Sequence, residues 1–409
     1  MDIIEIIDKK RLGNALTKGE LDFAFNGYLR GNIKDYQMSS LLMAITINGM
    51  NLDETVNLTD LMLTSGVKLD TTKINGVQVD KHSTGGVGDK TTLVIGPIMA
   101  CLGLKMPKLS GRGLGFTGGT IDKLESIPGF KVSLGVEELI SNVNRTGFSL
   151  AMQTPDLTPL DKVIYDLRNA TATVSSIPLI ASSIMSKKLA VGAKYILIDL
   201  KVGDGALVKT KKEAVELANT MIEIGKAYNR EVIPVLTNMD APLGDAVGNA
   251  LEVLEALNVL KGKNGAFRDL CVELSSVLYA RSMNVNLNVA KEKVINVLDS
   301  GLAYQKFLEF VSMQGGNIDA LETAPFMRPV FSDREGRLKG IKASTIGILS
   351  RDLGAGRSTL DDKIDYGVGI VINKHIGDNI RVGDILCYLY QNDEVDHSSD
   401  ALKAFTIAK

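Results

Sequence analysis

The stretch GVQVDKHSTGGVGDKTT, residues 76–92, decides the fold class of this chain. Apolar and polar residues alternate over residues 76–80, which predicts a β-strand. Residues 81–88 are rich in glycine and predict a loop, and the apolar segment after Thr91 predicts a helix. A strand, a glycine-rich loop and a helix in this order are typical of α/β folds.

The same alternation continues towards the C-terminus. A mostly parallel sheet covered by helices such as 211–228 is therefore predicted. Its further strands are expected at residues 105–109, 148–153, 195–202 and 232–236. From residue 325 onward, Gly, Val and Ile alternate with charged residues, which predicts a β-rich final unit.

Residues 1–66 have a different, helical pattern. Thr17 and Glu20 form a capping box, and residues 36–50 are apolar at helical spacing. We expect these helices to serve packing, including packing against another subunit. Residues 160–168 and 177–189 also predict helices, which we expect to pack back onto the N-terminal ones.

These patterns predict three parts. They are a helical domain (1–66 plus 160–190), an α/β domain (72–155 plus 192–324) and a β-rich C-terminal unit (325–409). The length of 409 residues fits two or three domains at about 150 residues each.

Composition narrows the function classes. Apolar residues make up 45% and charged residues 23%, as in globular proteins. The net charge of −2 provides no field for a nucleic acid. The apolar run 93–104 is shorter than the ~20 residues of a membrane-spanning helix, and Cys101, Cys271 and Cys387 are odd in number. We therefore expect a cytoplasmic protein without disulfides, membrane segment or zinc site.

A second glycine-rich loop, SGRGLGFTGGT, occupies residues 110–120. Such loops follow strands and precede helices, where backbone N–H groups and the helix dipole attract anions. One such loop alone is equally well a tight turn, but two loops rich in hydroxyl groups favour phosphate. Neither is a Walker A motif, so a small phosphate is favoured over a nucleoside triphosphate, although residues 113–118, GLGFTG, fit the pattern G-x-G-x-x-G. The donors predicted from the two loops are Lys81, Ser83, Thr92, Ser110 and Thr120.

Residues 110–125, SGRGLGFTGGTIDKLE, resemble at every position the signature of the thymidine and pyrimidine-nucleoside phosphorylase family. The segments KHSTGGVGD (81–89), YDLR (165–168) and SIMSK (183–187) occur in the family's order and spacing. The similarity extends over most of the chain.

The resemblance implies a helical domain that faces the α/β domain across a cleft, and a homodimer formed through the helices. It implies reversible phosphorolysis, in which inorganic phosphate and a pyrimidine nucleoside give the free base and an α-pentose 1-phosphate. No organic cofactor is implied. By this resemblance phosphate is bound by Lys81, Ser83, Thr92, Lys108, Ser110 and Thr120, and the base by Arg168, Ser183 and Lys187, with His82 beside it.

These roles are chemically coherent. The base leaves as an anion, so Arg168 and Lys187 stabilise charge that grows in the transition state. Without the family spacing, the interpretation of the same two cations as surface charges at helix C-termini would be favoured. His82 either donates a hydrogen bond to the substrate or is a structural histidine. If base and phosphate bind to different domains, a hinge motion must bring them together.

Three positions depart from or vary within the family pattern. Phe116 stands where members commonly have His. Lys108 is shared with the broad-specificity members, which favours an enzyme that acts on uridine as well as thymidine over a thymidine-specific enzyme.

The relatives' potassium site maps onto Gly88, Lys90, Leu243, Ala246 and Glu255. Position 90 is usually Thr, and we hypothesise that the Lys90 ammonium reaches Glu255 and replaces potassium. The chain ends at Lys409, earlier than typical relatives, so we also expect a trimmed final unit.

Two remoter alternatives are an enzyme like anthranilate phosphoribosyltransferase and a non-catalytic binding homologue. The first needs magnesium, and the sequence has no acidic pair dedicated to it. The second would be favoured by the loss of Lys81, Arg168 or Lys187, all of which are present.

Overall fold

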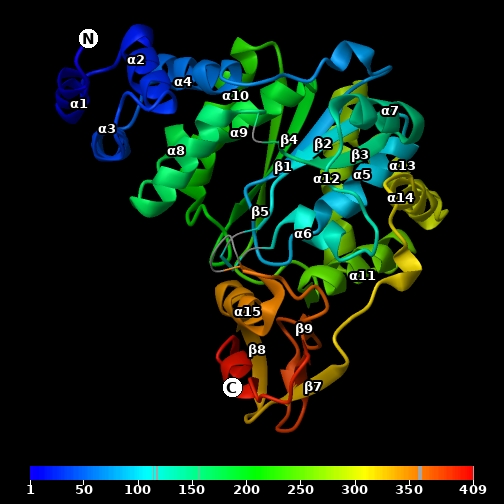
Figure 1. Cartoon of the computed structure of the whole chain (residues 1–409). Helices are drawn as coiled ribbons and strands as arrows, with labels where there is room; N and C mark the ends of the chain where they lie inside the picture. The colour runs from blue at the N-terminus through cyan, green and yellow to red at the C-terminus, as the bar shows by residue number, and fades with distance from the viewer. Residues whose placement is uncertain (114, 117, 155, 358–361, 409) are drawn as a thin grey trace. The chain divides into compact units, whose positions relative to one another are not determined.

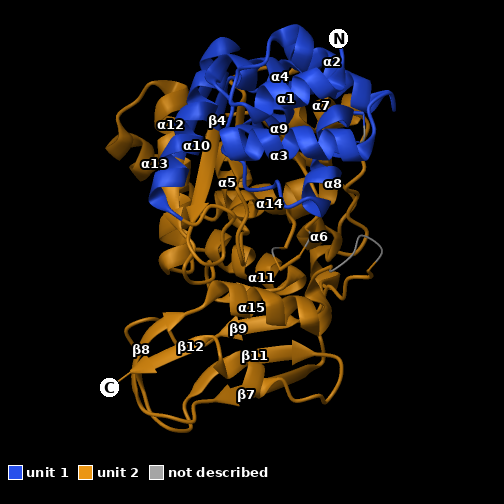
Figure 2. Ribbon diagram, turned by 90° about the vertical axis from the view of Figure 1, so that its left-hand side faces the viewer, with its two compact units in different colours: residues 1–73, 153–196, 210–234 blue, residues 74–152, 197–209, 235–409 orange. Residues whose placement is uncertain are grey.

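The computed structural model describes residues 1–113, 115–116, 118–154, 156–357 and 362–408. Two signature residues, Leu114 and Thr117, lie outside the described residues. The chain forms two compact units. Unit 1 comprises residues 1–73, 153–196 and 210–234, and unit 2 comprises 74–152, 197–209 and 235–409 (Figure 2).

Unit 1 is helical. The predicted capping box is confirmed, because the Thr17 side chain accepts a hydrogen bond from the backbone of Glu20 and the Glu20 side chain accepts one from the backbone of Thr17. Asn51 starts the fourth helix in the same way. The helices are α1 (Ile3–Arg11), α2 (Lys18–Leu29), α3 (Asp35–Asn48), α4 (Leu52–Thr64), η1 (Thr71–Lys73), α8 (Pro159–Ala170), α9 (Ile177–Val191) and α10 (Lys211–Ala227).

The helices α8 and α9 pack against the N-terminal helices, as the sequence predicts. Leu160 and Leu179 lie in one apolar core with residues of α1 to α4. The hydroxyl of Ser182 in α9 donates to the carbonyl oxygen of Thr55 in α4 at 3.2 Å. Segments far apart in the sequence therefore share one core within unit 1.

Unit 2 contains the two loops, each between a strand and a helix (Figure 1). The first strand and helix are β1 (Val79–Ser83) and α5 (Thr91–Cys101), and the second are β2 (Met106–Ser110) and α6 (Thr120–Glu125). The pattern predicted for both loops is confirmed. The other helices before the C-terminal region are α7 (Val136–Thr146), α11 (Asn249–Leu260), α12 (Ala266–Met283), α13 (Leu287–Asp299), α14 (Leu302–Met313) and η2 (Ile318–Ala320).

The strands confirm most of the predicted positions. β1, β4 (Tyr195–Val202) and β5 (Glu231–Asn238) form a sheet in the order β1-β4-β5, and β2 pairs in parallel with β3 (Phe148–Met152). The boundary of the first strand was wrong, since residues 81–83 belong to β1 and not to the loop. The strand can include Lys81 because its side chain is buried and its charge is paired with Asp199.

The C-terminal region is rich in strands, as predicted. β11 pairs antiparallel with both β7 and β9, and β8 lies between β10 and β12. Val330, Leu338 and Leu389 are fully buried in its core. The elements are β6 (Ala246–Val247), β7 (Phe326–Phe331), β8 (Gly336–Ile341), α15 (Ala343–Ser350), η3 (Arg351–Ala355), β9 (Gly369–Ile372), β10 (Asn379–Ile380), β11 (Ile385–Gln391), α16 (Ser398–Leu402) and β12 (Phe405–Ala408).

The fold class predicted from the sequence, a helical part with a larger α/β part and a β-rich end, is confirmed. The predicted domain boundaries remain a prediction. The compact units divide the chain in another way, with residues 210–234 in unit 1 and the β-rich region in unit 2. Among the described residues, no helix is long and apolar enough to cross a membrane.

Candidate functional site

Three of the six residues predicted to bind phosphate flank the first loop. Lys81, His82 and Ser83 end strand β1, and Thr92 is the second residue of α5. Lys81 and Thr92 are buried, whereas His82 and Ser83 are partly exposed. The close return of the loop requires glycine at position 88, where φ is +76° and a Cβ would lie 2.8 Å from a backbone oxygen.

Lys81 belongs to a buried cluster of charges. Its Nζ donates to the hydroxyl of Thr91 at 2.5 Å and lies 3.4 Å from Asp199 and 3.8 Å from Asp89. Asp199 also pairs with Lys201 at 2.8 Å. Two lysines and two aspartates therefore balance one another, which avoids the large cost of an unpaired buried charge.

The cluster shifts the pKa of Asp89 and that of Lys201. Burial alone would raise the pKa of Asp89, but Lys81 and Lys201, with hydrogen bonds from Ser83 and Thr91, hold it well below the ordinary value. Burial opposes the charged form of Lys201, yet Asp89 and Asp199 raise its pKa. Both directions favour the charged forms of Asp89 and Lys201.

Lys108 and Ser110 lie on the neighbouring strand β2. The Nζ of Lys108 is 3.7 Å from Asp80 in β1 and donates to the carbonyl oxygen of Leu109 at 3.1 Å. Ser110 is the last residue of β2, at the start of the second loop. Both side chains are largely buried.

Charged residues of the signature hold the second loop in place. Asp122 accepts hydrogen bonds from the backbone of Gly113 at 2.6 Å and from Arg357 at 2.7 Å. Arg112 pairs with Glu125. Thr120 is the first residue of α6 and is partly exposed. The acidic part of the signature thus shapes the loop that Thr120 ends.

Phe116 packs against the apolar core of the C-terminal region. Its ring and carbonyl oxygen lie so close to Gly347 that a Cβ there would meet them at 3.0 and 2.7 Å. The position at which relatives commonly carry His therefore has a packing role in this chain.

The residues predicted to bind the base lie in unit 1. Arg168, in α8, is almost fully buried and donates to the backbone oxygens of Thr173, Val174 and Leu179 at 2.7 to 3.3 Å. It is therefore not a surface charge at a helix end. Burial lowers the pKa of Arg168, while Asp161 acts in the opposite direction.

Lys187, in α9, lies beside Asp161 and Tyr165 of α8, the helix that also carries Arg168. Its Nζ is 2.5 Å from Asp161 and donates to the hydroxyl of Ser183 at 3.2 Å. The ring of Tyr165 lies 5.7 Å from the Arg168 guanidinium and 5.8 Å from the Lys187 ammonium. The three predicted base residues are thus brought together by two helices.

The residues of the predicted cation site also converge. The Lys90 ammonium reaches Glu255 and the carbonyl oxygens of Leu243 and Ala246. Gly88 lies against the same two carbonyl groups. All of these residues belong to unit 2.

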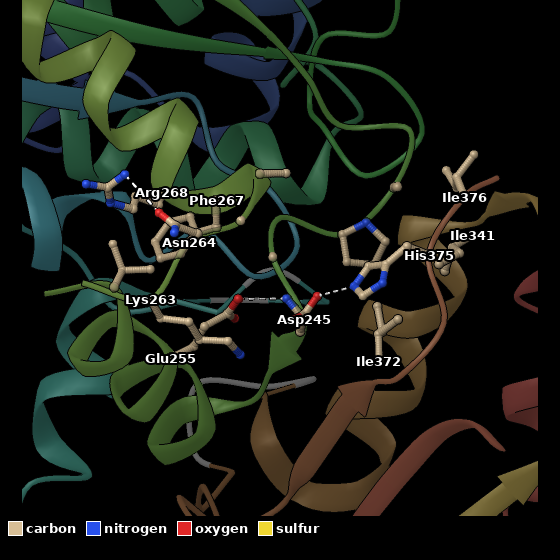
Figure 3. Close-up of a pocket in the computed structure, with 16 residues that line it drawn as sticks. Asp245, Glu255, Lys263, Asn264, Phe267, Arg268, Ile341, Ile372, His375 and Ile376 are labelled. Atoms are coloured by element: carbon tan, nitrogen blue, oxygen red, sulfur yellow. Dashed lines mark hydrogen bonds and ion pairs between the residues drawn. The ribbon is translucent and has the colours of Figure 1, made fainter. Parts of the chain in front are cut away.

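A cavity of about 490 Å³ opens beside Glu255 (Figure 3). On its wall, the Asp245 carboxylate and the His375 ring are hydrogen-bonded at 2.8 Å. Its described lining residues include Glu255 but none of the predicted phosphate or base residues. We therefore do not assign the predicted catalytic site to this cavity.

Sequence reasoning missed the partners of the predicted residues. Asp199 and Lys201 stand two residues apart in the strand YILIDLKV, so they share one face, and charges within an apolar strand are a signal of buried pairing. Asp161 precedes Tyr165 by one helical turn, which is a weaker signal.

Comparisons with known proteins agree with this architecture. The helical bundle domain of a glycosyl transferase family matches residues 4–66, and its a/b domain matches 75–304. The pyrimidine nucleoside phosphorylase C-terminal domain matches residues 337–408. A crystal structure of anthranilate phosphoribosyltransferase from Thermus thermophilus aligns with a TM-score of 0.61, 16% identity, and coverage of 76% of this chain and 99% of that one. That likeness shows the fold alone.

The fold and these domains define a glycosyl-transferring enzyme. Proteins named pyrimidine-nucleoside phosphorylase from Geobacillus stearothermophilus and Bacillus subtilis are each 45% identical over 96% of this chain and 93% of their own length. The one from Staphylococcus epidermidis is 46% identical over 97% of this chain and 94% of its own. The chain therefore belongs to the pyrimidine-nucleoside phosphorylase family, and the family and enzyme class predicted from the sequence are confirmed.

Proposed function

We propose that this chain catalyses the reversible phosphorolysis of pyrimidine nucleosides: uridine, thymidine and deoxyuridine. The products are the free base and α-D-ribose or deoxyribose 1-phosphate. A phosphate oxygen bonds to the anomeric carbon as the carbon–nitrogen bond breaks. The electron pair of that bond leaves with the base, which then takes up a proton.

One observation carries this proposal. The chain is about 45% identical, over nearly its whole length, to proteins named pyrimidine-nucleoside phosphorylase. The matched family models cover the two loops and the C-terminal domain. It favours this activity over the phosphoribosyl transfer named for the structural neighbour, whose sequence identity is only 16%.

We assign phosphate binding to the strand ends and loops of unit 2. Lys81 supplies a buried positive charge, and hydroxyl groups supply neutral donors that orient the anion. The Asp89 and Asp199 carboxylates near Lys81 balance its charge while phosphate is absent. The proposed phosphate residues are Lys81, Ser83, Thr92, Lys108, Ser110 and Thr120.

We assign base binding to the cluster of Arg168, Ser183 and Lys187 in unit 1. The cluster suits a leaving group that becomes an anion, because cations held by a protein stabilise developing negative charge without reorganising. The hydrogen bonds of Arg168 to three carbonyl groups fix its orientation. His82 is assigned to the substrate's surroundings as a hydrogen-bond donor.

The finer parts of the proposal concern specificity and assembly. Lys108 favours turnover of ribosides as well as deoxyribosides, with a thymidine-specific enzyme as the alternative. A homodimer through unit 1 is supported by the exposed apolar side chains of Ile4, Tyr36 and Ile47 on α1 and α3. We propose a cytoplasmic enzyme that uses inorganic phosphate as co-substrate and no organic cofactor.

Base release from uridine, thymidine and cytidine, each with and without phosphate, tests the proposal. Phosphate-dependent release from both uridine and thymidine is expected. Release from thymidine alone would leave the thymidine-specific alternative, and no phosphate-dependent release from any nucleoside would refute the activity.

Two variants separate the assigned roles. Lys81→Met should abolish phosphate binding and leave base binding intact, and Lys187→Met should do the reverse. Binding of each ligand is measured by calorimetry, with Lys226→Met, an exposed lysine in α10, as the matched control. Unchanged phosphate affinity in Lys81→Met would contradict the assignment of this lysine.

A further inference from the structure

Lys90 holds a buried ammonium group surrounded by oxygen atoms. Its side chain is fully buried, and its Nζ lies 2.5 Å from the Glu255 carboxylate. The same nitrogen donates to the carbonyl oxygens of Leu243 at 2.5 Å and Ala246 at 2.9 Å. An ammonium group has three N–H donors, so each donor has one oxygen acceptor.

The surroundings are built for a single positive charge. Among the described residues, Glu255 is the carboxylate within ion-pair distance of Lys90, whereas the buried Glu252 nearby is paired with Lys123. Glu255 also accepts hydrogen bonds from the backbone of Asp245 (Figure 3) and from that of Ala246, at 2.8 Å each. The ring of Phe267 lies 5.0 Å from the ammonium and covers it with its π-face. Two carbonyl dipoles, one carboxylate and one aromatic ring thus enclose one cation.

A potassium ion, which the family resemblance implies at positions 88, 90, 243, 246 and 255, does not fit this arrangement. The carbonyl and carboxylate oxygens that would bind it are already bound by the Lys90 nitrogen at hydrogen-bond distance. A second cation there would also leave two positive charges beside one carboxylate. We infer that the Lys90 ammonium is a built-in replacement for a monovalent cation, so that this chain needs no potassium to hold its first loop.

The replaced ion would have a positioning role. Lys90 lies between the glycine-rich loop and α5, directly before Thr91, whose hydroxyl accepts from Lys81. Its three acceptors come from the segment after β5 and from α11. The backbone of Leu243 also donates to the carbonyl oxygen of Val87 at 3.0 Å. The ammonium therefore fastens the loop that carries Lys81 to the rest of unit 2.

A covalently attached cation differs from a bound one in a measurable way. A bound ion stabilises the folded state by an amount that rises with the logarithm of its concentration above Kd, whereas a lysine is always present. The wild type should therefore melt at the same temperature in KCl, NaCl and choline chloride of equal ionic strength.

Two variants of the same position complete the test. Lys90→Thr supplies a small oxygen-bearing side chain in place of the ammonium, and it should create a need for potassium. In choline chloride it should melt several degrees below the wild type, and KCl should restore most of the loss. Lys90→Met removes the charge and fills the space, and KCl should not restore it.

The kinetic readout rests on the proposed function, whereas the melting readout does not use a nucleoside. In choline chloride, Lys90→Thr should raise the KM for phosphate about 10- to 100-fold, with a smaller effect on the KM for the nucleoside, because the phosphate loop loses its support. KCl should reverse this change.

Three outcomes would overturn the inference. They are a potassium-dependent melting temperature of the wild type, equal behaviour of Lys90→Thr in KCl and choline chloride, and rescue of Lys90→Met by KCl. If Lys90→Thr does not fold in choline chloride, its refolding on addition of KCl replaces the melting measurement, and failure to refold counts against the inference.

Discussion

Asp199→Asn removes one carboxylate from the buried cluster around Lys81 and leaves its shape intact. In the wild type the Asp199 carboxylate is fully buried, accepts from Thr237 at 2.6 Å and faces the ammonium groups of Lys201 and Lys81 at 2.8 and 3.4 Å. The asparagine oxygen can still accept from Thr237. The substitution therefore changes mainly the charge, from a neutral cluster to one with a net charge of +1.

The expected loss of stability follows from this change. Removing one partner of a buried ion pair costs about 3–5 kcal/mol, because the other charge stays buried without compensation. At roughly 2 °C per kcal/mol for a large domain, the melting temperature should fall by roughly 6–10 °C. Thr237→Val, which deletes one hydrogen bond to the same carboxylate but no charge, should cost only about 1 kcal/mol.

Inorganic phosphate should offset much of the loss, because the unbalanced cluster attracts the anion that Lys81 is proposed to bind. A ligand at about 100 times its Kd stabilises the folded state by about 2.7 kcal/mol. The assay is differential scanning calorimetry of wild type, Asp199→Asn and Thr237→Val over a range of phosphate concentrations, with chloride held at equal ionic strength. The phosphate-induced shift should be largest in Asp199→Asn. An equal or smaller shift there would refute the idea that this cluster faces the phosphate site.

Further expectations concern groups in both units. The pKa of Asp89 is depressed in the folded state, so its carboxylate contributes stability that is fully present above the ordinary pKa of 3.8. This stability is lost as the pH falls through the lower folded-state pKa. Denaturant titrations below pH 4 should therefore show a steeper loss of stability in the wild type than in Asp89→Asn. Asp161→Asn should leave Lys187 without its partner at 2.5 Å and raise the KM for the nucleoside about tenfold, with the KM for phosphate unchanged; a rise in both would contradict a base-side role. Burial raises the pKa of Cys387 to about 12, so a thiol reagent at neutral pH should label the partly exposed Cys101 first, as mass spectrometry of the folded protein can check.

Local signals in the sequence predict much of the fold. The capping box at Thr17 sets the start of α2, because its hydrogen bonds join residues only three positions apart. The apolar strand 195–202 and the helix at 177–189 follow from periodicity, and the structure places them within two residues of the prediction. Each of these features depends on neighbouring residues, which the sequence displays directly.

The partners of the site residues depend on contacts between distant segments. Lys81 and Asp199 belong to different strands, and only the order of the sheet shows that they meet. The end of β1 at Ser83 is hard to predict for the same reason. A lysine such as Lys81 is expected to be exposed unless a distant carboxylate pairs with it. Lys90 is the exception, because the resemblance to the family predicts its pairing with Glu255, and the structure contains this pair.

Lys81 and Lys90 lie on the two sides of one loop, and the distances around them indicate different tasks. Lys90 has three oxygen acceptors at 2.5 to 2.9 Å, so its donors are used and it is a fixed part of the structure. Lys81 has one short contact, to Thr91, while the carboxylates of Asp89 and Asp199 lie beyond the usual hydrogen-bond range of about 2.7–3.2 Å. The charge of Lys81 is therefore balanced, but its ammonium group lies outside hydrogen-bond distance of both carboxylates. An incoming anion can accept hydrogen bonds from this ammonium group without first breaking a strong ion pair. In the proposed phosphate site, we therefore expect Lys90 to keep the shape of the loop and Lys81 to meet the ligand.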